Sequence, residues 1–128
     1  MIANVQDILS RCEKTASWNG LKISDLTQRN SMGDTPLHTV CTWGEVESAK
    51  RLLAAGAKVN ALGDRGCTPL FNAIMGGSVA VVKTLLDAGA DVSIRSADGW
   101  LPVEYAKNTR APAEVIAVLE RAPQPRRR

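Results

Sequence analysis

Apolar residues near the N-terminus follow a helical spacing. Four of them would share one face of a helix of about three turns, and these are Val5, Ile8, Leu9 and Cys12. Asn19-Gly20 then breaks the pattern. The apolar residues between positions 21 and 26 are loosely spaced, as in a short extended segment. We therefore expect one helix, a break and an extended piece before the regular part of the chain.

Pairs of helices are expected to follow. Three stretches carry the same apolar stripe, with Val46, Ala49, Leu52 and Leu53, then Val79, Val82, Leu85 and Leu86, then Pro112, Val115, Val118 and Leu119. Before each lies a shorter stretch that opens with Pro36, Pro69 or Pro102. Proline suits the first turn of a helix because its missing N–H would be unpaired there anyway. Thr35 and Thr68 stand where an N-cap is expected.

One local sequence is written three times with a period of 33 residues. It reads GDTPLHT from Gly33, GCTPLFN from Gly66 and GWLPVEY from Gly99. Gly56-Ala57 and Gly89-Ala90 keep the same offset. A fixed period of this length is typical of a stacked array of small supersecondary units.

Gly-x-Thr-Pro-Leu-His at this period resembles the ankyrin repeat. The resemblance covers residues 30–121 and implies a mainly α solenoid, in which stacked helix-turn-helix units are joined by β-hairpin-like fingers. The first repeat would need cover on its outer apolar side. We divide the chain into a divergent N-terminal capping segment (1–29), repeat 1 (30–62), repeat 2 (63–95), a C-terminal capping repeat (96–121) and a disordered basic tail (122–128).

Composition and charge exclude several classes of function. The net charge of +3 rests on three C-terminal arginines, because without them the chain has 13 basic and 13 acidic residues. A neutral body argues against a nucleic-acid footprint spread over the fold. We find no signal peptide or membrane span, and three cysteines without a Cys-x-x-Cys pair fit a reducing compartment. We expect a monomeric cytoplasmic protein, outside the membrane, that needs no cofactor or metal.

No catalytic set emerges from the sequence. His38 is the only histidine, and the resemblance gives its imidazole a structural role, in which it bonds to backbone and ties adjacent loops. Phe71 replaces it in repeat 2, so the network should be incomplete there. Cys41 should be a small buried hydrophobe. Cys67, beside Arg65, is the one candidate nucleophile. We therefore do not expect an enzyme.

A partner would bind, by the resemblance, at the finger tips and along the exposed side of the inner helices. Carried over position by position, the candidates are Met32, Asp34, Asp64, Arg65, Cys67, Asp98 and Trp100 at the tips, and Thr42, Trp43, Met75, Asn108 and Thr109 on the inner helices. The finger aspartates favour a partner protein with a basic patch.

Tryptophan side chains are the expected anchors of binding. Trp43 and Trp100 would each contribute about 2 kcal/mol to a complex. The alternative is that Trp43 packs on neighbouring helices and Trp100 covers the last finger. Trp18, in the capping segment, is expected in the core.

Three hypotheses of function follow. The first is a non-enzymatic module that covers a surface of a partner protein, for example a small inhibitor or the immunity partner of a toxin. The second is an accessory protein for nucleic acid or an anionic surface, acting through Arg126–Arg128, with strongly salt-dependent binding. The third is a thiol enzyme or redox sensor using Cys67, which would be labelled rapidly at neutral pH.

Overall fold

Helices form all the regular structure in the described part of the chain. The computed structural model describes residues 4–122, with helices α1 (Val5–Glu13), α2 (Pro36–Trp43), α3 (Val46–Ala54), α4 (Pro69–Gly76), α5 (Val79–Asp87), α6 (Pro102–Asn108) and α7 (Ala113–Arg121). A 3-10 turn, η1 (Asp64–Gly66), precedes α4. These residues contain no strand, so the fingers are built from turns. The basic tail, except Ala122, lies outside the described residues.

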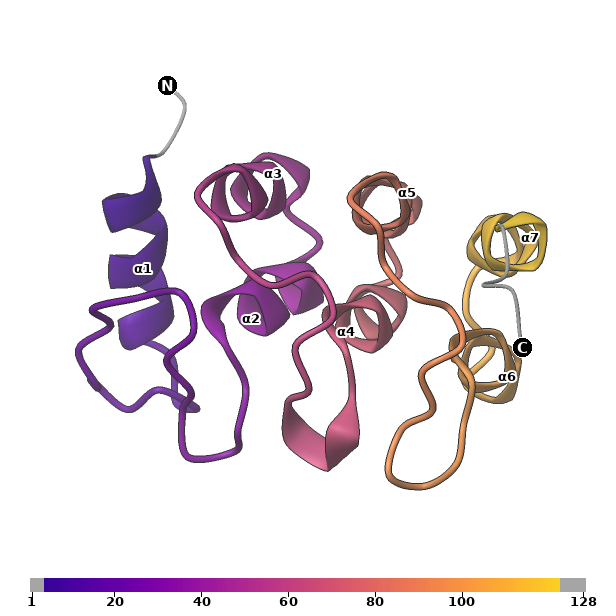
Figure 1. Ribbon diagram of the computed structural model, residues 1–128, viewed down its shortest axis with the longest axis horizontal. Helices are drawn as coiled ribbons and strands as arrows, with labels where there is room; N and C mark the ends of the chain where they lie inside the picture. The colour runs from indigo at the N-terminus through magenta and orange to yellow at the C-terminus, as the bar shows by residue number, and fades with distance from the viewer. Residues whose placement is uncertain (1–3, 123–128) are drawn as a thin grey trace.

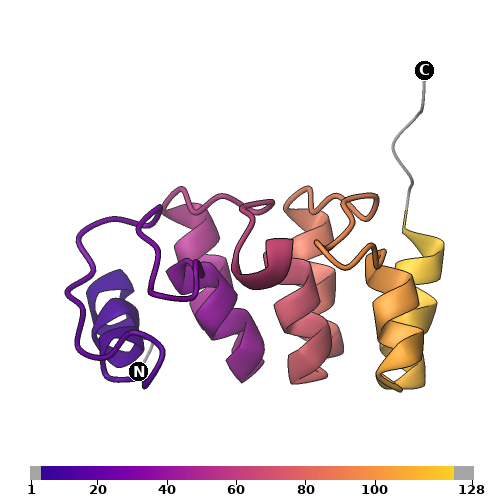
Figure 2. The same cartoon turned by 90° about the horizontal axis from the view of Figure 1, so that it is seen from below.

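The helices stack in two rows (Figure 1). The inner row contains α2, α4 and α6, and the outer row contains α3, α5 and α7. The loops that precede the three inner helices project together from one side of the stack, as fingers. Figure 2, seen from below, shows the helix pairs side by side along the long axis. The three predicted helix pairs are confirmed.

Helix α1 covers the N-terminal end of the stack. It lies across the direction of the other helices (Figure 1) and packs against both α2 and α3. Its buried residues are Ile8, Leu9 and Cys12, as the apolar stripe predicts. Trp18 is only 2% exposed, and its indole N–H donates to the Thr39 hydroxyl over 2.9 Å. Trp18 therefore belongs to the core, as expected.

The segment after α1 differs from the extended piece that we expected. Ile23 is buried while Leu21 is 45% exposed. Residues 26–27 form a turn in register with the turns at 59–60 and 92–93. The capping segment thus keeps the loop of a repeat although it lacks the pair of parallel helices. Its local hydrophobic pattern carries no sign of this, because the turn is defined by backbone geometry.

Left-handed residues end the inner helices. Gly44 and Gly77 close α2 and α4 with φ of 72° and 71°, a conformation that glycine adopts without a steric penalty. Arg110 stands at the same position after α6 with φ of 58°. The turn into the outer helix is therefore kept in the last pair without its glycine.

Gly76 and Trp43 occupy equivalent positions in neighbouring inner helices. A Cβ atom on Gly76 would lie 2.7 Å from the carbonyl oxygen of Thr42, so only glycine fits where α4 meets α2. At Trp43 the preceding element is α1, and the indole has room. The guanidinium of Arg11 lies 4.8 Å from the centre of the Trp43 ring and bonds to both carboxylate oxygens of Glu45 at 2.9 and 2.5 Å.

None of the helices within residues 4–122 is both long and apolar enough to span a membrane.

Candidate partner-binding groove

The first two fingers are tied together by His38. The Thr35 N–H donates to its Nδ1 over 3.1 Å, so the proton of the neutral ring sits on Nε2. Nε2–H donates to the Cys67 carbonyl oxygen over 2.9 Å. Burial lowers the pKa of His38, which keeps the ring neutral. The structural role predicted for His38 is confirmed.

The second tie is incomplete, as the replacement of His38 by Phe71 predicts. Thr68 is the N-cap residue of α4, but its hydroxyl is buried and has no hydrogen-bond partner within the described chain. Its side chain therefore does not cap the helix, contrary to our expectation. The opposing loop differs too. A Cβ on Gly63 would come within 2.7 Å of His38 Nε2, whereas Ser96 occupies the equivalent place opposite Phe71.

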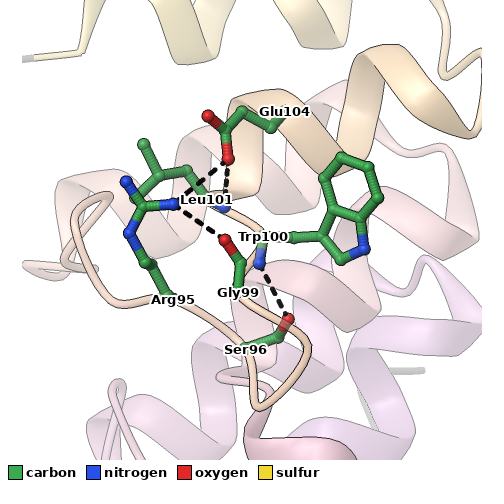
Figure 3. A network of polar contacts seen from close by, with 6 residues as sticks. All are labelled: Arg95, Ser96, Gly99, Trp100, Leu101 and Glu104. Carbon is green, nitrogen blue, oxygen red and sulfur yellow. Dashed lines mark hydrogen bonds and ion pairs between the residues drawn. The ribbon is translucent and has the colours of Figure 1, made fainter.

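In the last unit Glu104 takes the histidine position. Its carboxylate accepts the Leu101 N–H over 2.9 Å, as Nδ1 of His38 accepts from Thr35, and pairs with Arg95 at 3.4 Å. Arg95 also donates to the Gly99 carbonyl oxygen over 2.8 Å. Figure 3 shows these bonds fixing the third finger, with the Trp100 indole turned to the other side of it.

A groove runs between the fingers and the inner helices α4 and α6. We call it the finger groove, and its volume is about 490 Å³. It is lined by Asp34, Asp64, Arg65, Cys67, Asn72, Met75, Ser96, Asp98, Trp100, Tyr105 and Asn108. The residues come from all three fingers and two inner helices, so the groove exists only in the stacked fold.

Apolar side chains on the finger groove are only partly covered. Met75 is 53% exposed and Trp100 is 37% exposed. Tyr105 is anchored beneath them by an edge-to-face contact with buried Phe71, with ring centres 5.5 Å apart. A large apolar side chain held at the surface on a rigid helix or finger is a feature of residues that dominate binding energy.

The charges of the finger groove are uncompensated. Asp64, Asp98 and Arg65 take part in none of the ion pairs of residues 4–122. Asp34 is engaged differently, because its Oδ1 accepts the Asp64 N–H over 2.8 Å. Three aspartates and one arginine give the groove a net negative charge. Complementary charge on a partner would steer its approach.

The family model described as ankyrin repeats, in three copies, matches residues 5–96. The chain belongs to the ankyrin-repeat family. The matched range takes in α1 and the capping segment and ends before α6 and α7, which nevertheless pack as a third helix pair. No curated protein matches the chain in sequence. Ankyrin repeats are general protein–protein interaction modules and, as a class, have no enzymatic activity.

The ankyrin stack brings most of the predicted binding residues together. Eight of the twelve candidates line the finger groove, and these are Asp34, Asp64, Arg65, Cys67, Met75, Asp98, Trp100 and Asn108. Thr42 lies beside them, because its hydroxyl accepts the Asn72 side-chain N–H over 3.0 Å. Met32 is 52% exposed on the first finger, and Thr109 follows α6 as its C-cap.

Trp43 is not brought to the finger groove. It is half-buried and faces α1 beneath Arg11, because its position on α2 points toward the preceding element, as the close approach of Gly76 to α2 demonstrates. The sequence argument placed it correctly at the end of an inner helix but not on the correct side. The packing alternative describes its surroundings in this structure.

Three groove residues were missed by the sequence argument, namely Asn72, Ser96 and Tyr105. Asn72 and Tyr105 precede the candidates Met75 and Asn108 by three residues on α4 and α6. Residues at this spacing lie on the same face of a helix, so the signal was present. Ser96 is found only from the fold, because its position is glycine in the preceding loop.

Cys67 does not have the surroundings of an activated thiol. It is half-buried, and its pKa is raised by burial and then by Asp64 and Asp34. A nucleophilic cysteine instead needs a lowered pKa. Burial also raises the pKa of Cys41 to about 12, in line with its expected place in the core. Residues 4–122 hold no cluster of three metal-ligating side chains.

Proposed function

We propose that this ankyrin stack binds a partner protein in the finger groove and acts by covering a surface of that partner. The observation that carries the proposal is the coincidence, in one groove, of exposed Met75 and Trp100 with unpaired Asp64 and Asp98. An apolar centre with a charged rim is the usual anatomy of a protein interface. The partner surface would be apolar at its centre and basic at its edge.

Inhibition, as in an immunity-type protein, is the form of action that we favour. The described chain offers a binding groove without catalytic groups, so an effect on the partner would come from occlusion. We infer that a 1:1 complex blocks the partner's own active or assembly surface. Measuring the partner's activity with and without an equimolar amount of this protein tests this point. Unchanged activity in the saturated complex would leave tethering as the function.

Affinity measurements on groove variants test the binding site. The partner is first captured from cells that make this protein, and its dissociation constant is then measured by calorimetry. Trp100→Ala should weaken binding about 30-fold, since truncation of an aromatic anchor costs about 2 kcal/mol. Asp98→Asn should weaken it less at high salt than at low salt, because exposed charges are screened.

Matched controls come from other surfaces of the same stack. Lys83→Ala changes an exposed residue of α5, on the outer row, and should leave affinity unchanged. Trp43→Ala removes the other candidate anchor, which packs under Arg11, and should reduce stability rather than affinity. Binding that survives Trp100→Ala but is lost with Trp43→Ala or Lys83→Ala would refute the groove as the site.

A further inference from the structure

A second cleft lies at the junction of the capping segment and the first helix pair. It has a volume of about 560 Å³ and shares no residue with the finger groove. Its walls include Leu26, Thr27, Lys58, Val59 and Ala61. The corresponding junction of the next two units is closed, and the way it is closed indicates what the open cleft would bind.

The closed junction is bridged by the side chain of Asn60. Its Nδ2–H donates to the Gly89 carbonyl oxygen over 3.3 Å, and its Oδ1 accepts the Asp91 N–H over 2.9 Å. One carboxamide thus satisfies a backbone acceptor and a backbone donor that lie two residues apart. A carboxamide has both a donor and an acceptor, which a carboxylate or an ammonium lacks.

The open junction has the same backbone but no carboxamide. Thr27 stands 33 residues before Asn60, in the same turn, and both its N–H and its hydroxyl bond back to Asp25 Oδ1 at 2.7 and 2.6 Å. The backbone pair that corresponds to Gly89 and Asp91 is Gly56 and Lys58. The Gly56 φ of 106° matches the Gly89 φ of 97°.

This backbone pair is unpaired within the described chain. The Gly56 carbonyl oxygen and the Lys58 N–H take part in no hydrogen bond among residues 4–122. We infer that the cleft is a docking site for an asparagine or glutamine side chain of a partner protein. Its carboxamide would accept from Lys58 N–H and donate to the Gly56 carbonyl, while an adjoining apolar residue would contact Leu26, Val59 and Ala61. The inference is independent of the finger groove.

A matched pair of peptides tests the proposal. Acetyl-Leu-Asn-N-methylamide and acetyl-Leu-Asp-N-methylamide have the same backbone amides and differ only at one terminal group. Each is titrated into the ¹⁵N-labelled protein, and the Lys58 amide resonance is followed. The Asn peptide should shift it saturably and bind at least about fivefold more tightly, the factor that one hydrogen bond contributes. Equal or tighter binding of the Asp peptide would overturn the proposal and assign an anion site to Arg29 and Lys58.

Two variants supply internal controls. Thr27→Asn places a carboxamide where Asn60 stands in the next unit, so the Asn peptide should no longer shift Lys58, and the Tm should rise by about 3 °C. Asn60→Ala removes the natural bridge, so the same peptide should now shift the Asp91 amide as well. An unchanged response of Lys58 in Thr27→Asn, or no saturable shift in the wild type, refutes the proposed geometry.

Discussion

Replacing His38 by phenylalanine tests whether the imidazole ties the first two fingers. Phenylalanine keeps the ring in a fully buried site, and the chain itself has Phe71 at the equivalent position. The substitution leaves the buried Thr35 N–H without its acceptor, which costs about 1 to 3 kcal/mol. It also removes the bond to the Cys67 carbonyl, worth about 1 kcal/mol. Since phenylalanine regains part of this by apolar burial, we expect a net loss near 2 kcal/mol.

The pH dependence of stability gives this prediction a sharper form. Burial lowers the pKa of His38 below the ordinary value of 6.5, so the unfolded chain takes up a proton that the folded chain refuses. The free energy of unfolding should therefore fall as the pH drops below about 6.5, by at most about 1.4 kcal/mol per pH unit. The loss continues until the pH reaches the folded-state pKa. Because His38 is the only histidine, His38→Phe should lack this slope.

Urea unfolding followed by tryptophan fluorescence between pH 7 and 5.5 provides the assay. Carboxyl groups with lowered pKa values, such as that of Asp91, affect stability mainly at lower pH and cancel between the two proteins. The stability difference should be largest at pH 7 and narrow toward pH 5.5. A difference that stays constant, or a wild type whose stability does not fall, would refute the assigned tautomer and the tie.

Three further predictions concern packing between the units. Gly76→Ala should destabilise the protein by about 2 kcal/mol, because its Cβ would overlap the Thr42 carbonyl; a gain in thermal stability would contradict the close approach. Phe71→His and Ser96→Gly, measured singly and together, should show favourable coupling of about 1 kcal/mol, since glycine makes room for the ring; additive effects would disprove the steric link. Trp43→Ala should lower the unfolding free energy by about 2 kcal/mol, which chemical denaturation would measure, and a null effect would mean that the Arg11 contact is unimportant.

Much of the fold follows from the sequence because the repeat is written in residues with strict backbone requirements. Pro36, Pro69 and Pro102 begin helices, and Gly44 and Gly77 end them, so the period places three helix pairs directly. The capping segment was harder to predict. Its turn at residues 26–27 is in register with the repeats, but no proline or glycine marks it.

The finger groove was predicted in composition but not in detail. Positions that follow the repeat, such as Met75 and Trp100, were placed correctly, because a register fixes which side of an element faces outward. Trp43 was not, since its direction depends on α1, which breaks the period. Glu104 illustrates the same limit, because its bond to the Leu101 N–H and its pairing with Arg95 require the folded third finger.

Site-specific photo-crosslinking tests the central claim most directly. A benzophenone amino acid replaces Met75 or Asn108 in the finger groove, and, in control proteins, Lys83 on α5 or Glu47 on α3. The account predicts that the bound partner is crosslinked from positions 75 and 108 and not from positions 83 and 47. Crosslinks obtained only from the outer helices would show that the partner binds elsewhere on the stack.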